Sequence, residues 1–271
     1  MILEVTHHSL YQYEKPVFLE PQHFYYHPLH RNYIRLLDWK FEVSPAPQLS
    51  AQHIDLENNV FYQSWFDASL DRLQIKSFAK LEVTPFNPFD FLEEMQPKTD
   101  ETHAQRLYLN KIPLSRALID WSNKIEKAHI QTVPLLTDLC AKIHQGWKHT
   151  IRYDHSLLHP DVCFQEKQGA CRDLAWLMVQ ICRHFKIPSR FVSGYCFNPD
   201  LGDGHELHAW VEVFIYGAGW IGLDPSSGLF TTEYYIPVAT SYHPMNTLPV
   251  QGVYRGDASS QLETKVLIHT D

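Results

Sequence analysis

The sequence lacks several features that would mark other classes of protein. It has no apolar run approaching the roughly 18 residues of a membrane span, and its N-terminus has no basic region or signal-length apolar core. Lys and Arg form no clusters and the net charge is −8, which argues against nucleic acid or membrane as a partner. The five cysteines include no C-x-x-C pair, so we expect reduced thiols and a cytoplasmic protein.

What is present is the composition of an ordinary globular protein. The 271 residues are 44% hydrophobic and 20% charged, enough for two modest domains that each bury a core. Residues 1–90 carry several alternating runs separated by turn signals and no convincing helical pattern, which predicts a β-sandwich. The longest run has Leu73, Ile75, Ser77, Ala79, Leu81 and Val83 on one face.

The remaining chain predicts a mixed α+β core. Residues 91–133 read as a linker with a connecting helix, because prolines and acids precede an amphipathic pattern that begins at Pro113. Residues 134–271 form the expected core: a helix near Pro134, a second helix, several strands and one more strand close to the C-terminus. The sequence does not say which sheet that last strand joins.

One helix start carries a cysteine. From residue 174 to 185 apolar residues recur at the spacing of one helix face; they are Leu174, Leu177, Met178, Ile181, Cys182 and Phe185. Cys171 lies at the start of this helix, directly after the small residues Gly169 and Ala170. The free N–H groups and dipole of a helix N-terminus favour a thiolate there. Taken alone, a cysteine at this position is more typical of a small buried hydrophobe than of a nucleophile.

A second stretch supplies partners for a thiolate. Residues 207–216 alternate as a strand, with His208 on the face opposite the aliphatic side chains. A turn at residues 217–219 then leads into a returning strand that contains Asp224. If the two strands pair so that the numbers of facing residues have an even sum, Asp224 shares a face with His208; an odd sum separates them.

A cysteine, a histidine and an aspartate placed this way suit acyl transfer by a thiol. Cys171 would be the nucleophile, His208 its general base and Asp224 the group that orients the imidazole. The oxyanion needs two donors, of which the backbone N–H of Cys171 would be one. Gln165 and Gln168 are candidates for the second donor. Trp210 is a candidate for the wall of a substrate groove, or for a core residue.

The residues at this point resemble the bacterial transglutaminase-like superfamily, a branch of the papain-like thiol enzymes. Four segments in order carry the resemblance: residues 169–175 (GACRDLA), 187–195 (IPSRFVSGY), 208–213 (HAWVEV) and 219–225 (GWIGLDP). Residues 5–17 also resemble the N-terminal β-domain found with such cores. The resemblance implies a papain-like core, with its cysteine helix packed on an antiparallel sheet, and a triad at Cys171, His208 and Asp224. Residues 226–227 are Ser-Ser where the family usually has Thr and Asn, and residues 23–28 also depart from its pattern.

The 17 histidines raise the question of a metal site. His205 and His208 are separated by two residues and not by the three of the H-E-x-x-H zinc motif, and they lie in a strand pattern. His23, His27 and His30 have helical spacing in a segment without helical character. We therefore expect no metal ion. No calcium loop is present and the expected chemistry needs no cofactor.

The resemblance implies attack on a carboxamide or peptide carbonyl to give a thioester. We expect a hydrolase, that is a cysteine protease or amidase, acting on a peptide or another amide. An amine-transferring protein cross-linker would use the same three residues, because groove shape decides whether water or an amine reaches the thioester. A non-catalytic binding module that retains the fold is a further alternative. The N-terminal β-domain, or residues 86–95 beside it, could recruit a protein partner.

Overall fold

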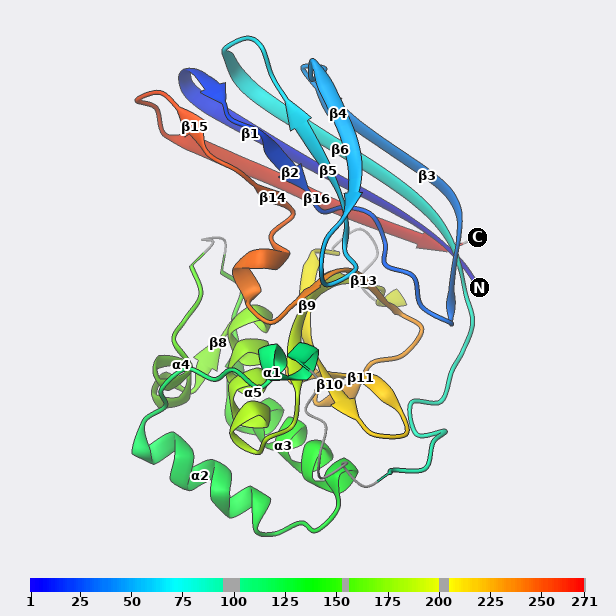
Figure 1. The fold of residues 1–271 in the computed structure, drawn as a ribbon, viewed down its shortest axis with the longest axis vertical. Helices are drawn as coiled ribbons and strands as arrows, with labels where there is room; N and C mark the ends of the chain where they lie inside the picture. The colour runs from blue at the N-terminus through cyan, green and yellow to red at the C-terminus, as the bar shows by residue number, and fades with distance from the viewer. Residues whose placement is uncertain (95–102, 153–155, 200–204, 271) are drawn as a thin grey trace.

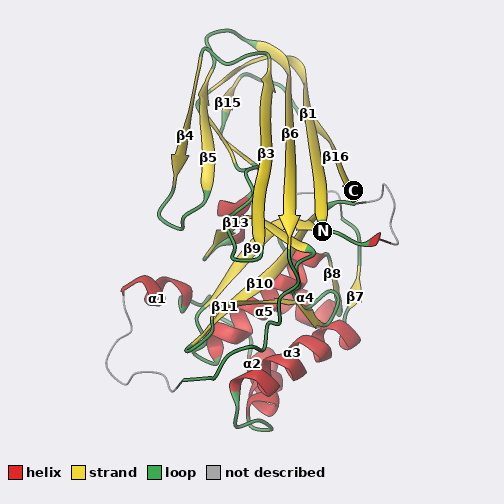
Figure 2. Ribbon diagram, turned by 90° about the vertical axis from the view of Figure 1, so that its right-hand side faces the viewer, coloured by secondary structure: helices red, strands yellow, loops and turns green. Residues whose placement is uncertain are grey.

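Two lobes make up the chain, and the computed structural model describes residues 1–94, 103–152, 156–199 and 205–270 of it. Figure 1 shows one lobe built from long strands and, below it, a second lobe in which helices surround a smaller sheet. Figure 2 shows the same division after a quarter turn, with the two chain ends side by side near the boundary of the lobes. Residues 95–102 of the expected linker lie outside the described residues. No described helix is long and apolar enough to cross a membrane.

The strand lobe is a β-sandwich of two antiparallel sheets, as predicted. The larger sheet has the order β15-β1-β6-β3 with β16 also paired to β1, and its strands are β1 (Ile2–Leu19), β3 (Ile34–Ser44), β6 (Leu70–Val83), β15 (Tyr254–Arg255) and β16 (Ser260–Thr270). The smaller sheet has the order β14-β2-β5-β4, with strands β2 (Gln22–Phe24), β4 (Leu49–Ile54), β5 (Val60–Trp65) and β14 (Val250–Gln251).

Alternating apolar side chains on the larger sheet contribute to two separate cores. Toward one end of its strands they pack on the helical lobe, in a cluster of Leu3, Val5, Ala79, Leu81, Val83, Val266 and Ile268 with Tyr195, Ile236 and Val238. Toward the other end they pack on the smaller sheet, in a cluster that includes Val17, Leu19, Phe24, Leu73 and Ile75. The apolar faces that alternation predicted for these strands therefore form the core of the sandwich at one end and the contact between the lobes at the other.

The end of the chain returns to the strand lobe. β16 pairs with β1 over eleven residue pairs, from Leu3 opposite Thr270 to Tyr13 opposite Ser260. Without β16, β1 would be an unpaired edge of the sheet. This placement corrects the expected core of residues 134–271, because its last strands, β14, β15 and β16, belong to the N-terminal sheets.

In the described residues, the second lobe is built on a five-stranded antiparallel sheet with five α-helices around it. The sheet has the order β12-β11-β10-β9-β13, with strands β9 (Ser189–Cys196), β10 (Leu207–Ile215), β11 (Gly219–Asp224), β12 (Leu229–Phe230) and β13 (Tyr235–Ser241). The described helices are α1 (His103–Tyr108), α2 (Arg116–Glu126), α3 (Thr132–Gly146), α4 (Pro160–Glu166) and α5 (Cys171–His184), with a short 3-10 helix η2 (Pro244–Thr247). A two-residue parallel pair joins β7 (Lys148–His149) to β8 (Gln168–Gly169). The fold is thus α+β, as predicted.

Helix α5 is the centre of this lobe. The sequence predicted one buried face, but every residue from Asp173 to Arg183 is buried. The reason is that α5 packs against β9 and β10 on one side while α2, α3 and α4 cover the others. Its start is therefore held in place from several directions.

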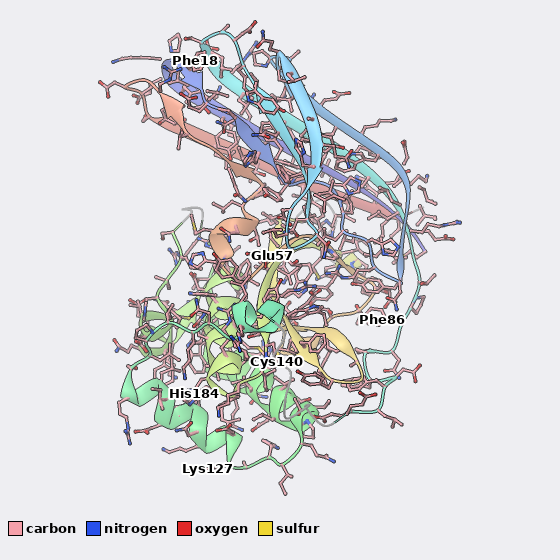
Figure 3. All side chains as sticks on the ribbon, in the orientation of Figure 1. Phe18, Glu57, Phe86, Lys127, Cys140 and His184 are labelled. Atoms are coloured by element: carbon pink, nitrogen blue, oxygen red, sulfur yellow. The ribbon has the colours of Figure 1, made fainter. Side chains whose placement is uncertain are left out.

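Buried polar contacts join the two lobes. Glu212 of β10 accepts a hydrogen bond from Arg31 of the strand lobe at 2.9 Å and one from Arg190 of β9 at 2.8 Å. Asn59, between β4 and β5, accepts from the backbone N–H of Thr240 and donates to its carbonyl, both at 2.8 Å. Glu57 lies at the boundary of the lobes in Figure 3 and accepts from the backbone N–H of Tyr242 at 3.0 Å. The β-sandwich is thereby fixed to the strands β10 and β13.

Candidate active site

Cys171 is the first residue of α5 and is partly buried. Among the described residues, its backbone N–H has no hydrogen-bond acceptor, as is usual in the first turn of a helix. A side chain at Gly169 would come within 2.9 Å of the Asp173 Cβ and 3.2 Å of the Cys163 Sγ. Only glycine therefore allows the chain to enter α5 along this path.

The hairpin of β10 and β11 brings His208 and Asp224 together. Val211 faces Leu223 and Glu212 faces Gly222, so the residue numbers have an even sum and the two side chains share a face. The His208 Nε2 lies 2.8 Å from the Asp224 Oδ2. Because Nε2 is bonded to the carboxylate, Nδ1 is the ring nitrogen left to face the thiol.

The imidazoles of His149 and His208 both act on the Cys171 side chain. Burial by itself would raise the pKa of the Cys171 thiol, but these two neighbouring imidazoles lower it from 9.0 to about 6. Burial would likewise lower the pKa of His208, yet Asp224 and Cys171 raise it well above 6.5. Both directions favour a thiolate paired with an imidazolium at neutral pH.

Asp224 is itself held by three donors besides His208. The backbone N–H and the hydroxyl of Ser226 donate to its Oδ1 at 2.8 and 2.7 Å, and the Tyr235 hydroxyl donates to its Oδ2 at 2.9 Å. Burial would raise the pKa of Asp224, but the charge of His208 and these hydrogen bonds hold it well below its usual range. Ser226, which departs from the family pattern in sequence, fixes the carboxylate. Tyr235 lies on β13, and no local pattern in the sequence pointed to it.

His149 is a neighbour of Cys171 that the sequence did not reveal. It lies on β7, a strand of only two residues, which is too short to show any periodicity. Its pKa is raised from 6.5, first by the hydrogen bond to Cys171 and against the effect of burial. The site therefore has two histidines at one thiol.

The three further candidates from the sequence lie in different surroundings. Gln165 is exposed on α4, and among the described contacts none joins it to Cys171. Gln168 is exposed on β8 and lines a pocket beside the site. Trp210 is only 1% exposed and packs edge-on against Tyr235 and beside His208, so it supports the imidazole from within the core and does not face a substrate.

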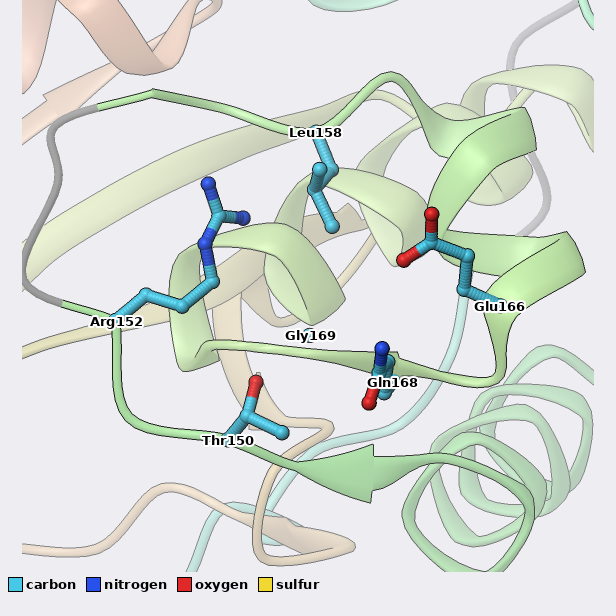
Figure 4. Close-up of a pocket in the computed structure, with 6 residues that line it drawn as sticks. All are labelled: Thr150, Arg152, Leu158, Glu166, Gln168 and Gly169. Carbon is cyan, nitrogen blue, oxygen red and sulfur yellow. The ribbon is translucent and has the colours of Figure 1, made fainter.

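The pocket beside the site has a volume of about 360 Å³ and is lined by Thr150, Arg152, Leu158, Glu166, Gln168 and Gly169. Figure 4 shows the side chains of Arg152, Leu158 and Glu166 around Gly169. Gly169 precedes Cys171 by two residues, and Thr150 directly follows His149. The pocket thus adjoins the start of the nucleophile helix.

Asp173 organises the loop that leads to Cys171. It is fully buried and accepts hydrogen bonds from the backbone N–H groups of Ala170 and Leu158, both at 2.9 Å. The Arg152 guanidinium pairs with it at 2.8 Å. This ion pair joins the start of α5 to a residue twenty-one positions earlier in the chain.

The other four thiols differ from Cys171. Burial raises the pKa values of Cys163 and Cys182 to about 12, and it raises those of Cys140 and Cys196 as well. Within the described part of the chain, no group of three or more His, Cys, Asp or Glu residues is arranged to hold a metal ion.

Two family models match this chain. Residues 122–225, which include Cys171, His208 and Asp224, match the model of the transglutaminase-like superfamily. Residues 3–82 match the model of the bacterial transglutaminase-like N-terminal region.

Individual relatives cover smaller parts of the chain. A protein-glutamine gamma-glutamyltransferase from Pseudomonas aeruginosa is 29% identical over 142 residues, which is 49% of this chain and 21% of that protein. An uncharacterized protein from Mycobacterium leprae is 32% identical over 106 residues, 37% of each chain. The present chain thus spans well under half the length of these relatives. A crystal structure of a candidate cysteine protease from Cytophaga hutchinsonii is similar with a TM-score of 0.76 at 20% identity, over 100% of this chain and 92% of that one, and so shares its fold.

Proposed function

Because the chain belongs to the transglutaminase-like superfamily, we propose that it is a thiol enzyme that cleaves a carboxamide or peptide bond with Cys171, His208 and Asp224. The observation that carries this proposal is the hydrogen bond between Asp224 and His208 at 2.8 Å, with the His208 imidazole acting in turn on the Cys171 thiol. The low thiol pKa of about 6 supports it, since the thiolate is the nucleophile.

In the proposed first step the Cys171 thiolate attacks the carbonyl carbon of the amide. A sulfur–carbon bond forms, the π electrons of the carbonyl move to its oxygen, and a tetrahedral oxyanion results. When the oxyanion collapses, the carbon–nitrogen bond breaks and the imidazolium of His208 gives its proton to the leaving amine. The product is a thioester on Cys171, and Asp224 holds the imidazole in one tautomer throughout.

In the second step the neutral His208 takes a proton from a water molecule, whose oxygen attacks the thioester. Collapse of the second oxyanion breaks the sulfur–carbon bond, releases a carboxylic acid and restores the thiolate. The net reaction is hydrolysis of an amide, as in a cysteine protease or amidase. No metal ion or cofactor takes part in these steps.

Transfer to an amine is the second candidate function. It is favoured by the similarity to the glutamyltransferase of Pseudomonas aeruginosa, which extends over 49% of this chain. A primary amine would replace water in the second step and the product would be a new amide. The same residues serve both reactions, so only the products separate them.

The nucleophile is tested by alkylation with iodoacetamide as a function of pH, read at each cysteine by mass spectrometry. We expect Cys171 to be half-maximally reactive near pH 6 and His208→Ala to shift this midpoint upward toward 9.0, the ordinary pKa of a thiol. Cys196 is the internal control because it is also partly exposed but has a raised pKa. A Cys171 that reacts no faster than Cys196 at pH 7 contradicts the proposal and favours a non-catalytic module.

The acceptor is tested with a glutamine-containing protein, such as dimethylated casein, and a fluorescent primary amine. Hydrolysis gives cleaved peptides or deamidated glutamine, whereas amine transfer attaches the fluorophore. Cys171→Ala is the control for both products. We expect hydrolysis to dominate; incorporation of the amine in preference to hydrolysis would assign the second candidate function.

A further inference from the structure

His149, the second histidine beside Cys171, has a backbone position that is fixed by strand pairing. β7 pairs in parallel with β8, and His149 lies opposite Gly169 in this pair. The ladder continues on both sides, with the N–H of Lys148 donating to the Lys167 carbonyl at 2.8 Å and the N–H of Thr150 donating to the Gly169 carbonyl at 2.9 Å. β8 then runs through Ala170 into α5, so His149 is tied to the chain just before Cys171.

Trp147, which directly precedes β7 and lies two residues before His149, anchors this strand in the core. Trp147 is 5% exposed, and its indole N–H donates to the Cys163 carbonyl at 2.9 Å. The indole also packs edge-on against Trp121. His149 therefore lies only two residues from a side chain that is fixed in the core, which limits how far its backbone can move.

The two histidines differ in what else they touch. The ring of His208 is bonded to Asp224, which suits a base whose proton must be oriented. For His149, no hydrogen-bonded carboxylate is found within the described residues; its strongest interaction is with Cys171, and the residue is exposed. An imidazole that neighbours the nucleophile and that no carboxylate orients through a hydrogen bond is suited to donating a hydrogen bond there.

During attack, negative charge leaves the sulfur and appears on the adjacent carbonyl oxygen. A donor that faces the sulfur before the attack is then beside this oxygen, as is the free backbone N–H of Cys171. We propose that His149 is the second oxyanion donor of the site, acting together with the backbone N–H of Cys171. This inference rests on the proposed function, and it takes the place of Gln165 and Gln168 in that role.

The test compares two reactions of Cys171 that differ only in whether an oxyanion forms. Iodoacetamide alkylates the thiolate by displacement, without an oxyanion, whereas 4-nitrophenyl acetate acylates it through one. Both rates are measured over pH for the wild type, His149→Ala, His149→Gln and, as a control from the same short strand, Lys148→Ala. Each rate is read at its plateau, so that a changed thiol pKa does not enter the comparison.

We expect His149→Ala to shift the pH midpoint of both reactions upward, because a hydrogen bond to the thiolate is lost. Its plateau rate of alkylation stays within about twofold, while the plateau rate of acylation falls about 100-fold, the lower end of the cost of one oxyanion donor. His149→Gln, which keeps an N–H donor, recovers most of the acylation rate. Lys148→Ala behaves as the wild type does.

Equal losses in the two plateau rates, or no loss in acylation, overturn the assignment of His149. A failure of the proposed function itself looks different. In that case the wild-type Cys171 reacts with neither reagent faster than Cys196 does, whatever residue stands at position 149.

Discussion

At the scale of single residues, the two histidines beside Cys171 have different roles, whereas the sequence motif assigned the whole task to His208. His208 is paired with a carboxylate that is fixed by Ser226 and Tyr235, and its ring is mostly buried. His149 is exposed and neighbours Cys171, which raises its pKa. The first arrangement stabilises an imidazolium, and the second leaves a donor available where charge develops.

The role of Asp224 can be tested by Asp224→Asn. The amide can donate a hydrogen bond to Nε2 and would then favour the wrong tautomer of His208, so we expect the rate of acylation at pH 7 to fall by about 10³ to 10⁴. Acylation by 4-nitrophenyl acetate gives the rate, and circular dichroism checks the fold. Asp38→Asn, on the distant edge strand β3, is the control. A loss below about tenfold would show that Asp224 does not orient the histidine.

Tyr235 acts on the site only through Asp224. Its hydroxyl donates to the Asp224 Oδ2 at 2.9 Å, and a hydrogen bond to a charged group contributes about 1.5–3 kcal/mol. We expect Tyr235→Phe to lower acylation by about tenfold, because the carboxylate is less well fixed. The same change should raise the pH at which His208 loses its proton, seen on the alkaline limb of the rate profile, because a carboxylate with one donor fewer attracts the imidazolium more strongly. Tyr234→Phe, at the exposed neighbouring position, should leave both unchanged. An unaltered alkaline limb in Tyr235→Phe would count against this role.

At the scale of elements, the loop before α5 depends on the buried carboxylate of Asp173. Its ion pair with Arg152 and its two backbone donors lie where water does not reach the carboxylate. We expect Asp173→Asn to reduce the free energy of unfolding by about 3–5 kcal/mol, as when one partner of a buried pair is removed. Urea denaturation measures the change.

The control for Asp173 is Asp120→Asn, which removes an exposed pair with Arg116 on α2. An exposed pair of this kind contributes at most about 0.5 kcal/mol. Similar changes in the two variants would mean that the loop before Cys171 does not depend on Asp173.

Elements with a local signature were predictable from the sequence, and those that depend on distant chain segments were not. The helical periodicity after Cys171 and the alternation around His208 each lie within one continuous stretch of sequence. The helix, the hairpin and their side-chain faces were therefore predicted. The register of β10 and β11 was left open, and the structure supplied the even sum. His149 and Tyr235 reach the site through a two-residue strand and through β13, for which a short sequence window holds no information.

At the scale of the whole molecule, the two lobes share a core, which explains why the domain boundaries drawn from the sequence were too simple. β16 comes from the end of the chain but completes the sheet of the first lobe. Side chains of that same sheet then pack against Tyr195, Ile236 and Val238 of the second lobe. Alternation identified β16 as a strand, but the pairing partner lies more than 240 residues away, so the pattern could not place it.

A buried histidine in this shared core should make the stability of the whole chain depend on pH. His7 of β1 is 2% exposed, with Nδ1 2.9 Å from the Tyr195 hydroxyl and Nε2 3.0 Å from the Thr264 hydroxyl. Burial, with a smaller effect of His8, lowers the pKa of His7 from 6.5 to about 3. Between these two values the unfolded chain binds a proton that the folded chain does not, so stability falls as the pH decreases below 6.5.

We therefore expect the free energy of unfolding to drop more steeply with acid in the wild type than in His7→Gln. Between pH 6.5 and pH 5 the additional loss should be about 2 kcal/mol, since each pH unit per proton corresponds to about 1.4 kcal/mol. Urea denaturation at pH 7, 6 and 5 gives the two slopes, and His30→Gln, at an exposed position, should keep the wild-type slope. Parallel curves for the wild type and His7→Gln would mean that His7 is not kept neutral between the lobes. If the free energy of unfolding of His7→Gln depends less on pH, even when the variant is less stable at pH 7, then the contact between β1 and β9 makes the fold sensitive to acid.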